Sequence, residues 1–275
     1  MVVSCLLIAL LFFPFLSLPL CAQTFPDSLI ARVVLLERIA YETGANSWNQ
    51  PGYPQATGFF VSFGSSDLRY LVTAKHAFHR PDTVQETQIS AVGTGGQNHE
   101  YILGDYRTSR SVLQHQDSLV DLIMIDNTTD GAGTDWNESL PYFRPSDIVG
   151  KQELESLRRG QKVVYIGRWP DPKDPANGTY RMPQGVFLKA ETDPLRLVDP
   201  ERRYAFKADF SLRIPGVPGV SGSPVLMRQG NKYRLLGIIS AFALDANKEL
   251  TSVAYCTAAY RILETMESRP TPIIK

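Results

Sequence analysis

Three short stretches of this chain carry side chains that together could perform acyl transfer. The first is a turn rich in glycine and proline, Pro218-Gly219-Val220-Ser221-Gly222-Ser223-Pro224, with a serine at its centre. Small neighbours would let a carbonyl carbon reach the Ser221 hydroxyl, and glycine adopts backbone angles that other residues avoid. The same turn can aim the N–H groups of Gly219 and Ser221 at one point, where they would stabilise an oxyanion. Alone the pattern is ambiguous, because Gly, Ser and Pro clusters are common in ordinary turns.

A histidine and an aspartate upstream could complete this chemistry. The run Leu71-Val72-Thr73-Ala74-Lys75 ends in His76, and Asp121 directly precedes another apolar run. The sequence order His, Asp, Ser is that of chymotrypsin, whereas subtilisin and the α/β-hydrolases use other orders. Asp117 lies in a polar stretch and Asp126 follows the second apolar run, so Asp121 is the favoured carboxylate.

These motifs resemble those of trypsin-like (chymotrypsin-fold, family S1) serine peptidases, and the bacterial HtrA-type protease domain more closely than digestive trypsins. The main matches are Thr73-Ala74-Lys75-His76, Asp121-Leu122-Ile123-Met124 and the segment from Gly219 to Pro224, with weaker ones at residues 160–167 and 236–240. The resemblance implies an all-β fold of two six-stranded antiparallel β-barrels with a short C-terminal helix. Since the resemblance covers about residues 55–260, we expect no appended PDZ domain of the kind found in many HtrA-type proteins.

The expected organisation follows from this resemblance and from local patterns. A signal peptide at residues 1–22 precedes a peptidase domain at residues 23–275, whose N-terminal barrel covers about residues 28–133 and whose C-terminal barrel covers about residues 146–260. A C-terminal helix and tail occupy residues 258–275, and residues 171–177, rich in Pro and Asp, predict a surface loop. Strands are expected at residues 57–63, 70–73, 162–166, 185–190, 203–208, 233–243 and 251–257, and a short helix at residues 151–159.

The resemblance also assigns roles to single residues. His76 would be the general base, Asp121 its orienting partner and Ser221 the nucleophile, with Gly219 and Ser221 forming the oxyanion hole. Pro215 would lie at the base of the specificity pocket, where the lack of a carboxylate disfavours Lys or Arg substrates.

The segment Ser240-Ala241-Phe242 would pair with the substrate backbone in the manner of a strand. No metal or organic cofactor is expected. His76 and His79 are only two potential zinc ligands, and no Cys or carboxylate cluster completes a set.

Composition and the N-terminal segment indicate the compartment. The 28 basic and 28 acidic residues balance, which argues against nucleic acid as a partner. The apolar residues 2–20, followed by Cys21 and Ala22, predict a secretory signal cleaved after Ala22, although an uncleaved anchor is the alternative. The mature chain would keep Cys256 alone and form no internal disulfide, which suits a bacterial periplasmic or secreted protein.

The predicted function is therefore that of an exported serine endopeptidase acting on protein or peptide substrates, with no membrane contact beyond the signal segment. The main alternative is a catalytically silent trypsin-like domain that binds peptides or proteins. An esterase is a further alternative, but the motif Gly-x-Ser-x-Gly is absent because Ser223 takes the place of its last glycine. The oligomeric state does not follow from the sequence.

Overall fold

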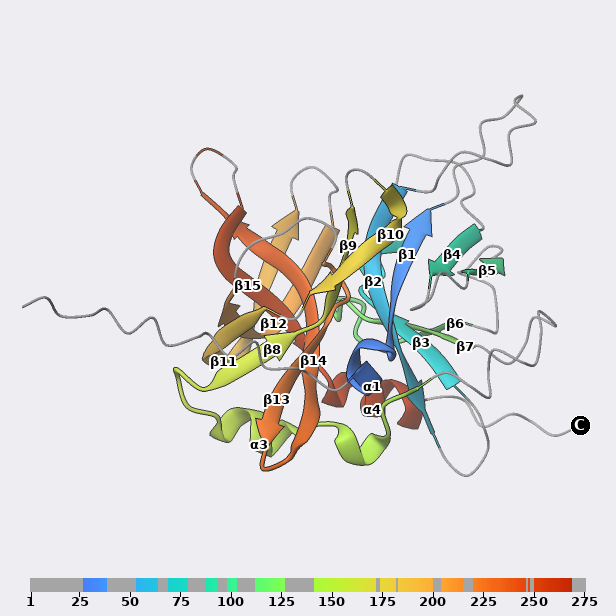
Figure 1. The fold of residues 1–275 in the computed structure, drawn as a ribbon. Helices are drawn as coiled ribbons and strands as arrows, with labels where there is room; N and C mark the ends of the chain where they lie inside the picture. Colours follow the sequence, from blue (N-terminus) through green and yellow to red (C-terminus); the bar gives the residue numbers. More distant parts are fainter. Residues whose placement is uncertain are drawn as a thin grey trace, which may run out of the picture.

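A computed structural model describes residues 27–38, 53–63, 69–78, 88–92, 98–102, 112–126, 141–171, 174–181, 183–199, 204–214, 220–245, 247 and 250–268. Within them the fold is mostly β, with two halves side by side and one helix near the C-terminus (Figure 1). The expected fold class is thereby confirmed. No helix within the described residues is long and apolar enough to span a bilayer.

The N-terminal half forms an antiparallel sheet of seven strands in the order β5-β4-β1-β2-β3-β7-β6. Its edge strands β5 and β6 are not paired with each other in the described residues. A short helix α1 (Asp27–Ile30) precedes it. The strands are β1 (Val33–Arg38), β2 (Tyr53–Ser62), β3 (Arg69–Thr73), β4 (Gln88–Val92), β5 (Asn98–Ile102), β6 (Val112–Gln114) and β7 (Ile123–Asp126).

The C-terminal half contains a closed six-stranded barrel in the order β11-β12-β15-β14-β13-β8. All its neighbouring strands are antiparallel, and inward residues such as Phe187, Phe210 and Cys256 fill its core. The strands are β8 (Lys162–Tyr165), β11 (Gln184–Asp199), β12 (Tyr204–Arg213), β13 (Pro224–Gln229), β14 (Lys232–Leu244) and β15 (Leu250–Ala258).

A separate two-stranded ribbon, β9 (Gly167–Asp171) and β10 (Asp174–Arg181), follows β8. The expectation of a surface loop at residues 171–177 is wrong, because most of this segment belongs to these two strands. Proline is compatible with such a ribbon because the outward side of an edge strand needs no N–H donor.

Helical segments are short and lie at the ends of strands. They are the 3₁₀ turns η1 (Lys75–Phe78) and η2 (Pro145–Asp147) and the helices α3 (Lys151–Ser156) and α4 (Tyr260–Glu267). The predicted helix at residues 151–159 is confirmed but ends earlier, at Ser156. The predicted C-terminal helix is confirmed as α4, and its apolar residues Ile262, Leu263 and Met266 pack at the junction of the two halves.

The two halves share one hydrophobic core. Phe59 and Val72 from the first sheet pack in the same cluster as Leu226 and Ile238 from the barrel and Ile262 from α4. Burying such side chains stabilises the fold by about 1.5–3 kcal/mol each. The junction is therefore a packed interface, and any site that spans it is held rigidly.

Candidate active site

Strand register brings His76 and Asp121 together. Strands β3 and β7 pair antiparallel with Thr73 opposite Ile123. His76 lies three residues beyond Thr73 in η1, and Asp121 lies two residues before Ile123. Because antiparallel strands run in opposite directions, the end of one and the start of the other meet at the same edge of the sheet. This edge faces the barrel of the second half.

His76 contacts both other members of the candidate triad. Its Nδ1 lies 2.8 Å from Asp121 Oδ2, and its backbone N–H donates to Asp121 Oδ1 at 2.9 Å. Its Nε2 lies 3.0 Å from the Oγ of Ser221. A carboxylate only accepts hydrogen bonds, so Nδ1 carries the proton and Nε2 is left to accept the Ser221 hydroxyl. This tautomer is the one that a general base requires.

Asp121 is fully buried. Burial alone would raise the pKa of its carboxyl, but the charge of His76 and hydrogen bonds from His76 and from the Ser240 hydroxyl outweigh burial, so the pKa lies below its ordinary value. Asp121 is therefore ionised at neutral pH and can stabilise an imidazolium on His76.

Ser240 supports Asp121 from the second half. Its hydroxyl is buried and lies 2.9 Å from Thr257 Oγ1. Either hydroxyl can be the donor in this contact. The resemblance assigns the backbone of Ser240 to the edge that pairs with substrate, and the structure adds that its side chain is buried.

The turn that contains Ser221 and Gly222 packs against the first sheet. The Thr57 N–H donates to the Ser221 carbonyl at 2.7 Å, and the Gly222 N–H donates to the Ile239 carbonyl at 2.8 Å. Gly222 has a φ of 81°, and a Cβ there would collide with the Thr57 carbonyl and with Thr73 Oγ1. Only glycine fits, because it tolerates both the backbone angle and the close approach. The turn is thus fixed by both halves of the molecule.

Other residues of the predicted site are placed as follows. Gly219 and Pro215 lie outside the described residues. Among the described residues the Ser221 N–H makes no backbone hydrogen bond, whereas the N–H groups of Gly222 and Ser223 donate to the carbonyls of Ile239 and Val220. Ala241 and Phe242 lie on β14 beyond its last pair with β13, and among the described residues they are paired with β15 alone.

The competing candidates lie elsewhere. Asp117 forms an ion pair with Lys207 at 2.5 Å rather than contacting His76. Asp126 pairs through its backbone with Tyr70 at the far end of β7. Ser223 is fully buried, and its hydroxyl has no hydrogen-bond partner among the described residues. The geometry therefore selects Asp121 and Ser221.

Two neighbours of His76 were not found from the sequence. The Phe206 ring, on β12, stacks beside the imidazole with centroids 6.4 Å apart and an interplanar angle of 21°. Phe206 is almost fully buried and shields one face of the imidazole from water. Lys75, directly before His76, is also buried. Neither has a local signal, because both contacts depend on how distant strands pack.

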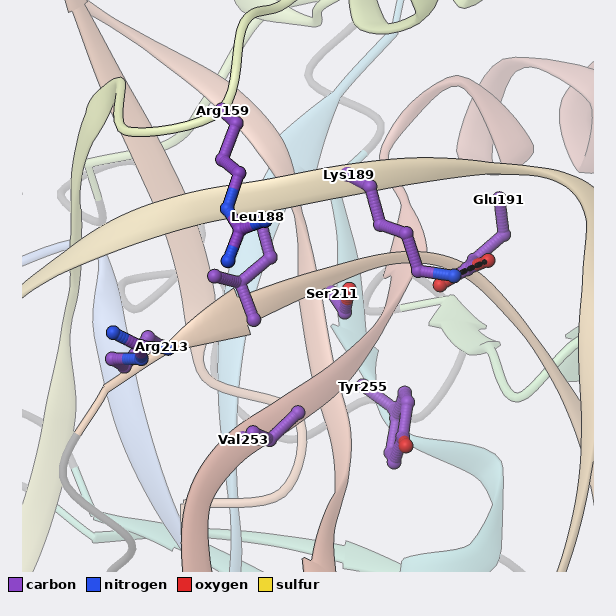
Figure 2. Close-up of a pocket in the computed structure, with 8 residues that line it drawn as sticks. All are labelled: Arg159, Leu188, Lys189, Glu191, Ser211, Arg213, Val253 and Tyr255. Carbon is purple, nitrogen blue, oxygen red and sulfur yellow. Dashed lines mark ion pairs between the residues drawn. The ribbon is translucent and has the colours of Figure 1, made fainter.

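Figure 2 shows a cavity in the second half of the molecule. It has a volume of about 260 Å³ and is formed by β11, β12 and β15 together with Arg159. Arg213, Ser211 and Lys189 line it, and Lys189 is paired with Glu191 at 2.9 Å. None of the residues that line it belongs to the triad. Among the described residues, no cluster of His, Cys, Asp and Glu could hold a metal ion.

The fold can be compared with those of solved structures. Its architecture is the trypsin-like double-barrel fold. The chain is similar to crystal structures of the Rv3671c protease from M. tuberculosis. The inactive form matches at 15% identity over 89% of this chain and 92% of that chain, with a TM-score of 0.51. The active form matches at 16% identity over 90% and 85%, with a TM-score of 0.54. No protein-family model and no curated protein sequence matches the chain.

Proposed function

We propose that this protein is a serine endopeptidase that cleaves peptide bonds through an acyl-enzyme. One observation carries the proposal: an unbroken series of hydrogen bonds runs from Asp121 through His76 to Ser221. The shared fold with a protease supports it. At 15–16% identity that likeness speaks for the fold, so the chemistry is argued from the side chains.

The mechanism follows from the protonation states. The Ser221 hydroxyl attacks the peptide carbonyl carbon while His76 Nε2 takes its proton, and Asp121 stabilises the resulting imidazolium. The N–H groups of Ser221 and Gly219 hold the oxyanion, and losing one such donor raises the barrier by about 3–4 kcal/mol. The imidazolium then gives its proton to the leaving amine. Water, activated by His76, hydrolyses the ester and restores Ser221.

Substrate recognition is proposed to use the open edge of β14. A peptide would add as an extended strand beside Ala241 and Phe242, which gives affinity without sequence selectivity. The family resemblance assigns Pro215 to the base of the specificity pocket, and the lack of a carboxylate there would favour apolar side chains over Lys or Arg. We also propose that residues 1–22 direct export to the periplasm or the medium.

Labelling with a fluorophosphonate, which reacts only with an activated serine, tests the proposal. The purified chain of residues 23–275 is compared with Ser221→Ala and with Ser223→Ala. The latter is a matched control because it removes a hydroxyl two residues away. We expect labelling of the wild type and of Ser223→Ala and none of Ser221→Ala.

Cleavage of an unstructured protein substrate then separates an endopeptidase from an esterase, since only the former yields internal fragments. Absence of labelling in a folded wild type would contradict the proposal and favour a binding domain.

A further inference from the structure

The segment of residues 115–120, which leads into the triad carboxylate, is bound by the second half of the molecule. The Lys207 N–H, on β12, donates to the Leu119 carbonyl at 2.7 Å, and Val120 forms an isolated parallel bridge with Lys207. The Lys207 ammonium also pairs with Asp117 Oδ2 at 2.5 Å. One residue of the barrel therefore holds this segment through both its backbone and its side chain.

Asp117 connects the Lys207 ammonium to the main chain just before Asp121. Its Oδ2 binds the ammonium, while its Oδ1 accepts the Leu119 N–H at 3.0 Å. Its carbonyl accepts the Val120 N–H, also at 3.0 Å. A hydrogen bond between two charged groups is shorter and stronger than one between neutral groups. Without the ammonium, the Asp117 side chain would keep only its local contact and could turn away from β12.

A second series of contacts joins the same segment to β12. His115 Nε2 lies 3.0 Å from Glu264 Oε2 on α4. Arg261, on the same helix, binds that oxygen at 2.9 Å and the buried carboxylate of Asp209 at 2.8 Å. Asp209 and Lys207 lie two residues apart on β12. Both ends of the segment are therefore anchored to one strand of the barrel.

Strand β12 also contacts His76, the other triad member of the first half. The Phe206 ring stacks beside the imidazole with centroids 6.4 Å apart. Since successive side chains of a strand point to opposite sides, Phe206 and Lys207 reach different parts of the site from adjacent positions. The His76 backbone N–H donates to Asp121 Oδ1 at 2.9 Å, a bond that requires both residues to be in place.

We propose that Lys207 is a positioning residue for the triad: its ion pair with Asp117 fixes the segment that carries Asp121, so the barrel places the carboxylate as well as the nucleophile. The role rests on the function proposed above, because it concerns the rate of that reaction. An ion pair about one third exposed adds only modestly to folding stability. Its main effect is therefore on the geometry of the triad.

Three variants and one control test the ion pair. Lys207→Met removes the ammonium and keeps the apolar stem, Lys207→Arg keeps the charge, and Asp117→Asn removes the charge of the other partner. Glu153→Gln is the matched control. Glu153 pairs with Arg234 at 2.6 Å, and these side chains are 29% and 21% exposed, but neither lies in the Asp121 segment or on β12.

Two readouts separate positioning from general stability. The first is the fluorophosphonate labelling rate of Ser221, together with kcat and KM on a peptide. The second is hydrogen exchange of the His76 backbone N–H by NMR, which reports whether Asp121 Oδ1 is in place and needs no turnover. The Ile214 N–H, which donates to the Ser252 carbonyl at 2.9 Å in the barrel, is the reference for opening of the fold.

We expect Lys207→Met and Asp117→Asn to lower kcat and the labelling rate by about 10-fold with KM unchanged. The effect is smaller than the roughly 100-fold loss caused by a displacement of about 1 Å, because Lys75 Nζ still donates to the Ser118 carbonyl at 2.5 Å. A variant with both changes should be no slower than either alone, since both remove one interaction. Lys207→Arg should label within about twofold of the wild type because it keeps the charge.

In the two charge-removing variants the His76 N–H should exchange about 10-fold faster than in the wild type. Exchange at Ile214 should change no more than it does in Glu153→Gln, which should label at the wild-type rate. Should Lys207→Met fail to fold, Asp117→Asn carries the same comparison, because the amide has the shape of the carboxylate.

The proposal requires faster exchange at His76 relative to Ile214. If neither charge-removing variant shows it, the proposal is overturned whatever labelling does, and equally slow labelling of Glu153→Gln would overturn it as well. Failure of the proposed function has a different signature, a folded wild type that does not label. Selective exchange at His76 in Lys207→Met would then support the role of Lys207 in placing Asp121 and reject the peptidase.

Discussion

Replacing Gly222 with alanine tests how the serine turn is held. Two contributions to the loss of folding stability in Gly222→Ala can be worked out from the structure. Gly222 has a φ of 81°, and an L-residue in this region costs about 1–2 kcal/mol. Its Cβ would also collide with the Thr57 carbonyl and lie 3.0 Å from the Ala74 N. Backbone atoms cannot swing aside like a side chain, so this overpacking adds about 1–3 kcal/mol.

The expected loss for Gly222→Ala is therefore about 2–5 kcal/mol in the free energy of unfolding. The turn would also move away from the first sheet, and a displacement of Ser221 by about 1 Å lowers the reaction rate by about 100-fold. Urea denaturation measures the first effect, and the fluorophosphonate labelling rate of the remaining folded protein measures the second.

Gly160→Ala is the matched control. Gly160 has a φ of 89°, but a Cβ at this position would meet nothing within 4 Å. The variant should therefore lose only the backbone contribution of about 1–2 kcal/mol and keep the wild-type labelling rate. If Gly222→Ala were no less stable than Gly160→Ala and labelled at the wild-type rate, the claim that the two halves clamp the turn would be refuted.

Three further predictions follow from single contacts. Asp121→Asn should lower kcat by about 10⁴-fold with little change in KM, because an amide favours the wrong His76 tautomer; an unchanged kcat would contradict the assigned role. Hydrogen bonding to Lys207 lowers the pKa of Asp117 below 3.8, so the stability that it contributes is present above that pH and lost as pH falls through the lowered value. Urea titrations should thus show the wild type more stable than Asp117→Asn at neutral pH, with the difference vanishing in acid. Burial raises the pKa of the Cys256 thiol well above 9.0, so a thiol reagent at pH near 8 should modify it only after unfolding, and rapid modification of the native protein would be inconsistent with its burial.

The sequence predicted those parts of the site that are marked by a pattern of neighbouring residues in the chain. Ser221 is recognisable because a turn needs its glycines and prolines within a few residues, and His76 and Asp121 stand at the ends of apolar strands. The C-terminal helix was predicted within two residues because its apolar positions recur at helical spacing. These features depend only on neighbours in the chain.

Features set by strand packing could not be predicted in this way. The burial of Ser240 and the irregularity in the pairing of β14 with β15 between Ile239 and Ala241 have no signal in the neighbouring sequence. The contact between Lys75 and Ser118 joins residues 43 apart, and the stacking of Phe206 on His76 requires the two halves to dock. At residues 171–177 the proline and aspartate content predicted a loop, but the described residues of this segment belong to the two strands of a ribbon.

The division of the triad between the two halves has a consequence for the life of the newly made chain. His76 and Asp121 belong to the first sheet, whereas Ser221 follows His76 by 145 residues and belongs to the barrel. In the unfolded chain the serine has no base held within reach. On the function proposed above, the Ser221 hydroxyl would be activated only once the barrel has closed and docked against the first sheet, so the newly made chain would stay inactive until it folds, without a separate inhibitor.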